Sequence, residues 1–304
     1  MRVKRLLLSS YRNYDHLDLE VTAQLCIFVG ANAQGKTNLL EALYYLATTR
    51  SFRATRDDEL IKWGADEAVM ACEVEREVAQ SEIRVRLARG KAKLIAVNGQ
   101  TLRRQLDLFG HLNVVTFSPD DLQLVKGGPS ERRRFLDMEL AQISPAYRHD
   151  MTTYQRILRQ RNNLLKEIAE WRAQPDLLEA WDLQLADTDS RIMARRAAAV
   201  THLASLAHTV RLTIRYRPFF GQAGEVSNWQ SLEMVRERFA GEIKRLRAVE
   251  MRRGQTLVGP QRDDLEFLIN DKDVRSYGSQ GQQRTCVLAS KLAEIEFMHA
   301  QTDT

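Results

Sequence analysis

Short apolar runs rich in β-branched residues alternate with polar segments over the first 117 residues, and this pattern predicts a mixed α/β lobe. The expected strands are residues 3–8, 25–29, 69–74, 83–87, 94–97 and 114–117. Asn98-Gly99 follows the fifth run and predicts a type I′ turn, because both turn positions need positive φ. After Gly35 the apolar residues recur at helical spacing, which predicts one helix among the strands.

From about residue 130 the apolar period becomes that of long helices. Residues 147–171 and 177–208 are expected to form a helical hairpin, with Pro145 and Pro175 as punctuation. Strand character returns at residues 265–269, and a final helix is expected over 282–299. The predicted organisation is a first lobe of residues 1–117, a helical lobe of residues 118–254, and a return to the first lobe over residues 255–304.

The composition is that of a soluble protein. The chain has 304 residues and a net charge of +5, which permits a nucleic-acid partner without establishing one. No run of about 18 apolar residues exists, so no membrane span is expected. The three cysteines lack the spacing of a zinc site, and Cys26 lies in an apolar run that predicts a core position. Unpaired thiols fit a cytoplasmic protein.

One motif predicts phosphate chemistry directly. An expected strand enters it and an expected helix leaves it, as the G-x-x-x-x-G-K-[ST] phosphate loop requires. Glycine permits a tight turn whose N–H groups surround a phosphate, the lysine contacts the β- and γ-phosphates, and the hydroxyl binds Mg²⁺. The motif therefore predicts ATP and Mg²⁺ as cofactors, against the alternative of a glycine turn before an ordinary helix. Its residues are Gly30, Ala31, Asn32, Ala33, Gln34, Gly35, Lys36 and Thr37.

A second segment precedes the last expected helix. Ser279, Gln280, Gly281 and Gln282 have the spacing of a capping box, with Ser279 as N-cap and Gln282 at the third helical position. Such a helix start binds anions well, but its simpler interpretation is a well-capped helix. Spacing alone leaves both interpretations open.

Three further blocks carry charged residues with two interpretations each. Arg12 lies in Tyr-Arg-Asn-Tyr after the first strand, and either contacts nucleotide or pairs with an acidic neighbour. The arginines of residues 132–134 oppose the dipole of a helix start, which favours a phosphate or carboxylate contact over a solvated turn. The Arg-Asp-Asp run of residues 262–264 is either functional or a surface salt-bridge cluster.

Together these blocks resemble the RecF family of bacterial recombination-repair proteins over residues 2 to about 298, with Gln261 where the family usually has His. The resemblance implies an ABC-type P-loop ATPase head, a mixed-sheet lobe with an inserted helical lobe. It also implies that residues 279–282 are the S-x-G-Q signature, which contacts the γ-phosphate held by a second subunit. ATP would then join a homodimer.

The resemblance further implies ATP-dependent DNA binding at gaps or junctions of single and double strands, in DNA repair, replication and the SOS response. RecR and RecO would be partners in loading RecA. Independent support is limited to basic runs at residues 84–93, 103–104, 156–161, 191–196 and 244–253. On a helix, Arg156, Arg159, Gln160 and Asn163 share one face, as do Arg191 and Arg195.

The acidic strand that follows the signature helix in ABC-type ATPases has no counterpart after residue 299. Either the chain is a shortened version, or it binds ATP without turning it over. No catalytic residue is therefore predicted. The alternative function is a nucleotide-binding, non-hydrolysing interaction module, and a P-loop kinase would leave residues 279–283 and the long helices unused.

Overall fold

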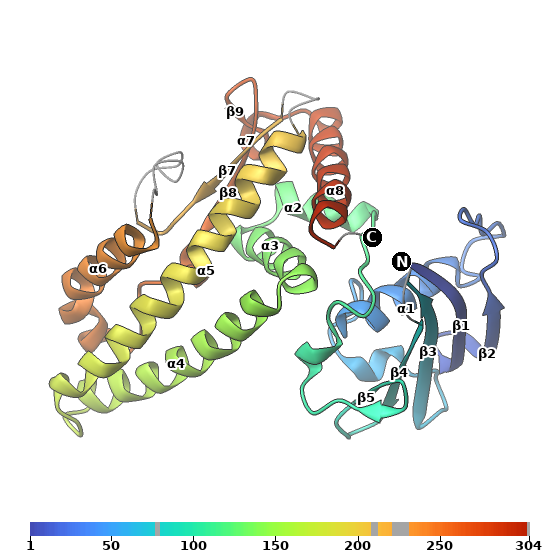
Figure 1. Ribbon diagram of the computed structural model, residues 1–304, viewed down its shortest axis with the longest axis horizontal. Helices are drawn as coiled ribbons and strands as arrows, with labels where there is room; N and C mark the ends of the chain where they lie inside the picture. Colours follow the sequence, from blue (N-terminus) through green and yellow to red (C-terminus); the bar gives the residue numbers. More distant parts are fainter. Residues whose placement is uncertain (77–79, 208–211, 221–230, 303–304) are drawn as a thin grey trace. The chain divides into compact units, whose positions relative to one another are not determined.

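The computed structural model describes residues 1–76, 80–207, 212–220 and 231–302, and it has two compact units (Figure 1). The first unit comprises residues 1–118 with 298–304, and the second comprises residues 119–297. Each unit has its own apolar core.

The first unit is built on a six-stranded antiparallel sheet in the order β2-β1-β3-β4-β5-β6. Helix α1 packs against β3 and β4, and buries Leu39, Ala42 and Leu46 on the face that the sequence predicts. Asn98 and Gly99 both have positive φ in the turn from β5 to β6, which confirms the predicted hairpin. The strands are β1 (Arg2–Tyr11), β2 (Tyr14–Glu20), β3 (Glu67–Glu75), β4 (Gln80–Ala88), β5 (Leu94–Val97) and β6 (Gln100–Thr101), and the helices are α1 (Lys36–Thr48), η1 (Asp57–Leu60) and η2 (Gln105–Leu108).

Two predicted strands of this unit are wrong. Residues 25–29 and 114–117 form no strand, and Leu25, Ile27 and Val29 are 77%, 76% and 90% exposed. A strand needs neighbours for its backbone N–H and C=O groups, and no described strand pairs with either segment. Cys26 is consequently exposed and not a core residue.

The second unit combines long helices with a small antiparallel sheet in the order β7-β8-β9. Helices α4 and α5 lie against each other as the predicted hairpin, and α6 packs on both (Figure 1). Pro145 and Pro175 occupy first-turn positions, where the missing N–H costs nothing. The elements are η3 (Pro119–Leu122), α2 (Gln123–Lys126), α3 (Pro129–Ile143), α4 (Pro145–Ala169), η4 (Pro175–Leu177), α5 (Leu178–Ala207), β7 (Leu212–Arg217), α6 (Leu232–Arg253), η7 (Pro260–Arg262), β8 (Asp264–Ile269), β9 (Lys272–Asp273), α7 (Val274–Tyr277) and α8 (Gln280–Thr302).

The predicted lobe bounds of residues 1–117, 118–254 and 255–304 stay a prediction; β8 pairs with β7 along its length, and residues 298–304 are grouped with the first unit. Residues up to 297 therefore belong to the second unit. The predicted strand at 265–269 and the predicted last helix are present as β8 and α8. The sequence interpretation missed β2, β7 and α6. Among the helices of the described residues, none combines the length and the hydropathy of a membrane span.

Candidate functional site

The phosphate loop, residues 30–37, contains a glycine, Gly35, that another residue would replace only with strain. Gly35 is the N-cap of α1 and has φ 98°, a left-handed conformation that favours glycine. A Cβ atom at Gly35 would lie 2.7 Å from Asn13 Nδ2 and 2.9 Å from the Tyr14 hydroxyl. Both the backbone conformation and this close approach explain the second glycine of the motif.

The start of α1 is open to an anion. Its N-cap offers no side-chain hydrogen bond, and its first turn contains no acidic residue. The N–H groups of a first helical turn lack partners within the helix, and they carry the positive end of the dipole. Lys36 Nζ donates to the carbonyl oxygens of Gly30 at 2.8 Å and Ala31 at 2.7 Å, so its ammonium group is folded over the loop. Thr37 is exposed in the same turn.

The turn between β1 and β2 supports the loop through side chains that the sequence interpretation did not single out. Asn13 Nδ2 donates to Gln34 O at 3.2 Å, and the Tyr14 hydroxyl donates to Gly35 O at 3.2 Å. Asn38 Nδ2 donates to Asn13 Oδ1 at 2.8 Å, and Asn38 Oδ1 accepts from Arg53 Nη1 at 3.0 Å. The short Tyr-Arg-Asn-Tyr motif was the only feature of the sequence that pointed to this turn. The sequence interpretation singled out its arginine, Arg12, and not Asn13 or Tyr14.

Arg12 pairs with an acidic neighbour, the second of the two predicted alternatives. Its guanidinium donates to both carboxylate oxygens of the buried Glu41, at 2.9 and 2.6 Å, and to Glu59 O at 3.0 Å. Burial acts to lower the pKa of Arg12, but the Glu41 carboxylate more than compensates and raises it. Arg12 thus fastens the turn that carries Asn13 to helix α1.

The signature segment, residues 279–282, has the geometry of the predicted capping box. Ser279 N donates to Gln282 Oε1 at 2.8 Å, and Gln282 N donates to Ser279 Oγ at 3.3 Å. Ser279, Gln280, Gly281 and Gln282 are all exposed at the start of α8. The segment therefore presents a preformed helix N-terminus to solvent, part of whose hydrogen bonding is satisfied locally.

Arg132 and Arg133 contact acidic and carbonyl groups where β8 begins. Arg132 donates to both carboxylate oxygens of Asp264, at 2.6 and 2.9 Å, and it is buried. Arg133 Nη1 donates to Asp263 O at 2.8 Å. A carboxylate contact therefore accounts for the unfavourable position of Arg132 at a helix start. It also ties α3 to the β8 segment.

Asp263 is a core residue and not part of a surface cluster. Its carboxylate accepts hydrogen bonds from Arg196 Nη1 at 2.9 Å, from Phe219 N at 3.1 Å and from the Tyr216 hydroxyl. Burial raises the pKa of Asp263 to about 6, although these donors oppose the shift. A buried charge needs such partners, so this network organises the unit around α5.

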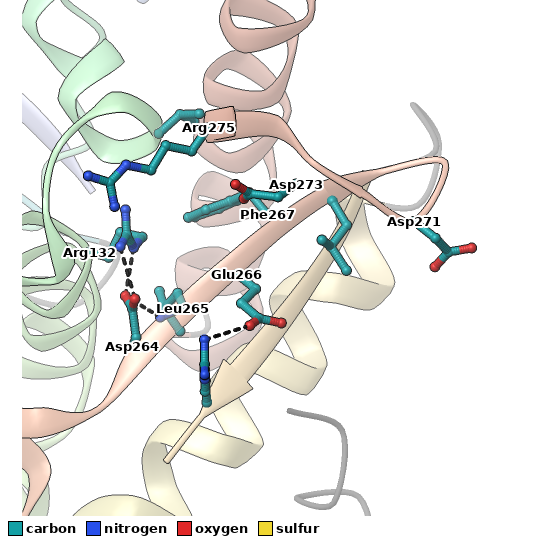
Figure 2. Close-up of a pocket in the computed structure, with 11 residues that line it drawn as sticks. Arg132, Asp264, Leu265, Glu266, Phe267, Asp271, Asp273 and Arg275 are labelled. Carbon is teal, nitrogen blue, oxygen red and sulfur yellow. Dashed lines mark hydrogen bonds and ion pairs between the residues drawn. The ribbon is translucent and has the colours of Figure 1, made fainter. Parts of the chain in front are cut away.

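A pocket of about 320 Å³ lies beside the Arg132–Asp264 pair (Figure 2). Four carboxylates line it, and each has a partner: Asp264 pairs with Arg132, Glu266 with Arg217 at 3.3 Å and Asp271 with Arg215 at 3.1 Å, while Asp273 caps α7. Among the residues that the structure describes, no cluster of acidic, histidine or cysteine side chains is arranged to hold a metal ion. Arg275 of α7 also lines the pocket, and α7 leads into the signature segment.

A buried charged cluster supports α8 from α3. Lys291 Nζ lies 2.9 Å from Glu294 Oε2 and 3.7 Å from Asp121 Oδ1. Glu139 of α3 is buried beside them, and burial together with Glu294 raises its pKa well above the usual range. One ammonium group does not balance three carboxylates, so burial and Glu294 together favour the neutral form of Glu139.

Comparisons with known proteins agree with this architecture. The family model described as the RecF/RecN/SMC N terminal domain matches residues 2–300. The chain is 43% identical over 307 residues to the DNA replication and repair protein RecF of Halalkalibacterium halodurans, covering 98% of this chain and 81% of the relative. It is 39% identical over 312 residues to the RecF protein of Bacillus subtilis, with 99% and 83% covered.

A solved structure described as the recombination mediator protein RecF-ATP in the RecFOR pathway superposes with a TM-score of 0.93 at 33% identity. It covers 99% of this chain and 82% of that one, so the chain spans about four fifths of its relatives. The fold is the α/β fold of an ABC-type ATPase head with a helical lobe. The chain belongs to the RecF family of DNA replication and repair proteins.

Proposed function

We propose that this chain binds ATP and Mg²⁺ at residues 30–37, and that bound ATP joins two copies into a clamp on DNA during recombinational repair and replication. The observation that carries the proposal is the open N-terminus of α1. There the ammonium group of Lys36 is folded over the loop and donates hydrogen bonds to the loop's own carbonyl groups. Relatives described as RecF-ATP support ATP as the nucleotide.

The residues of the loop fit a nucleoside triphosphate. Lys36 would exchange the carbonyls of Gly30 and Ala31 for the β- and γ-phosphate oxygens, which are better partners for an ammonium group. The N–H groups of the loop and of the first turn of α1 would surround the β-phosphate. The exposed Thr37 hydroxyl would hold Mg²⁺. Asn13 and Tyr14 would keep the loop in shape.

The signature segment would complete the site in a second copy. Ser279 and Gly281 lie exposed at a preformed helix start, which is suited to the γ-phosphate of a neighbouring protomer. Bound ATP would then hold the two copies together, because each nucleotide contacts both of them. Its γ-phosphate is the group that distinguishes the joined from the separate state.

The DNA and protein partners follow from the family. RecF proteins are replication and repair proteins, and a solved relative is placed in the RecFOR pathway. We therefore infer binding at gaps or at junctions of single and double strands, assistance to RecA loading, and RecR and RecO as partners. No element of a known sequence-reading type is present in the described residues, so we expect binding without sequence specificity.

Solution mass by light scattering tests the proposal. With ATP and Mg²⁺ we expect a dimer, twice the 35.0 kDa of the chain, and with ADP and Mg²⁺ a monomer. Lys36→Ala should stay monomeric in both. A wild-type chain that stays monomeric with saturating ATP would contradict the ATP-dependent dimer. Phosphate release by the same preparation separates turnover from binding alone.

A further inference from the structure

Several arginines of the basic runs are paired with acids or buried in the folded protein. Arg84 pairs with Glu82 at 2.8 Å, and Arg86 pairs with Glu67 at 2.5 Å. Arg161 and Arg196 are buried and take part in the internal networks of the second unit. A basic run in the sequence therefore does not by itself provide free positive charge on the surface.

The outer face of helix α4 has two arginines without counter-ions. Arg156 and Arg159 are exposed, and within the described part of the chain neither forms an ion pair or a side-chain hydrogen bond. Asn163 and Lys166 continue the stripe at spacings of four and three residues, and both are exposed. The stripe from residue 156 to residue 166 is about 15 Å long at the rise of an α-helix.

One buried acid explains why this face carries no negative charge. Asp150 is the only acidic residue between residues 145 and 166, and it is buried. It accepts from Arg191 Nε of α5 at 3.1 Å and from Arg195. These two arginines of α5 neutralise the Asp150 carboxylate inside the unit. The outer face of α4 therefore has no acidic residue before Glu167. Its exposed residues are His149, Thr152, Gln155, Arg156, Arg159, Gln160, Asn163 and Lys166.

From this geometry we infer that the outer face of α4, residues 156–166, binds the phosphate backbone of DNA. The inference rests on the proposed function and assigns its nucleic-acid contacts to one helix face. Guanidinium groups bind phosphate oxygens through paired N–H donors, and amide side chains add hydrogen bonds without reading bases. Arg191 and Arg195, although equally basic in sequence, take no part because Asp150 holds them.

The test compares two double variants that lose the same charge. In the first, Arg156→Gln and Arg159→Gln remove the free guanidinium groups of α4. In the second, Arg84→Gln and Arg86→Gln remove two exposed arginines that are already paired with acids. Glutamine suits a helix about as well as arginine, so the α4 variant should keep its fold, which circular dichroism and ATP binding check.

The measurement is fluorescence anisotropy of a labelled gapped duplex with ATP and Mg²⁺ over a series of salt concentrations. We expect the α4 variant to bind at least about tenfold more weakly and its salt slope to fall by about two, one for each lost phosphate contact. Arg156→Lys with Arg159→Lys should keep most of the affinity and the slope. The Arg84 and Arg86 variant should bind like the wild type.

Each outcome separates the inference from the function on which it rests. If the wild type binds DNA and the α4 variant binds equally well, the assignment to α4 is wrong and the proposed function stands. If both double variants lose affinity equally, net charge and not this face drives binding, which also overturns the assignment. If the wild type itself fails to bind DNA with ATP, the proposed function fails first.

Discussion

The two helix starts that the sequence marks as phosphate-binding, those of α1 and α8, are built in opposite ways. The start of α1 has a glycine N-cap and no side-chain hydrogen bond, and side chains from the β1–β2 turn hold its loop in shape. At the start of α8, two backbone N–H groups have partners within the segment, because Ser279 and Gln282 exchange hydrogen bonds. An uncapped start has N–H groups to spare for a ligand, whereas a capped start has fewer.

This difference assigns separate tasks to the two segments. The loop before α1 should determine how tightly a single chain binds ATP. The segment before α8 should matter only when a second copy contributes it to a nucleotide already bound. Each of the following variants alters one side of this comparison.

Lys36→Ala should have the largest effect. It removes the ammonium group that is folded over the loop, and with it the charge that would contact the phosphates. Loss of charge-assisted hydrogen bonds costs about 1.5–3 kcal/mol, which corresponds to roughly 10- to 100-fold weaker ATP binding. Titration calorimetry with ATP and Mg²⁺ measures this. Lys91→Ala removes an exposed lysine outside the loop of the same unit and should bind ATP normally.

Ser279→Ala should leave ATP binding by the single chain unchanged and weaken the ATP-dependent dimer about tenfold or more. The substitution also removes an N-cap, which costs about 1 kcal/mol of stability. Ser231→Ala controls for that cost, since Ser231 caps α6 through a hydrogen bond from Met234 N. Sedimentation velocity gives the dimer constants. Equal weakening in both variants would show that lost capping, and not a contact in the second copy, is the cause.

Asn13→Ala tests whether the β1–β2 turn supports the loop from a distance. It deletes the hydrogen bond to Gln34 O and the acceptor for Asn38. Each such bond contributes about 1 kcal/mol, so ATP should bind several-fold more weakly although Asn13 belongs to neither phosphate-binding segment. An unchanged ATP affinity, measured with a fluorescent nucleotide, would mean that the loop keeps its shape unaided.

Glu139→Gln should have the smallest effect, visible only in the pH dependence of stability. Burial raises the pKa of Glu139 in the folded chain, so its stabilising contribution is complete below the unfolded pKa and is lost as the pH rises through the folded pKa. Glutamine resembles the protonated acid and removes this loss. Urea unfolding at pH 5 and pH 8 should show the variant gaining on the wild type at pH 8, on the order of 1 kcal/mol.

If the free energies of unfolding of the variant and the wild type changed in parallel with pH, the raised pKa of Glu139 would be contradicted. Glu294→Gln is the informative comparison. It removes the carboxylate that pairs with Lys291, and should destabilise the unit at both pH values. A loss of stability there, beside a gain at residue 139 at pH 8, separates the two acids.

Features that depend on a few neighbouring residues were predictable from the sequence. The glycine conformation at Gly35 and the capping box of Ser279 and Gln282 each follow from local backbone chemistry, and both are present. The α4–α5 hairpin was predictable for a related reason, since apolar periodicity over many residues identifies a long helix.

Features that depend on distant partners were not predictable. Residues 25–29 have a strand-like composition, yet a strand exists only where another segment pairs with it. The sequence left the partner of Arg12 open, because Glu41 lies 29 residues away on a helix. Likewise, the charged Asp263 lies in the core only because Arg196 and Tyr216 meet it there.

A mixing experiment tests the central claim, that one nucleotide is shared by the loop of one copy and the signature segment of another. Lys36→Ala has an intact signature segment, and Ser279→Arg has an intact loop. We label the two variants with a donor and an acceptor fluorophore and add ATP and Mg²⁺. The account predicts no dimer of either variant alone and energy transfer on mixing, because a mixed pair restores one complete site. A mixture that stays monomeric, while the wild type dimerises, would contradict it.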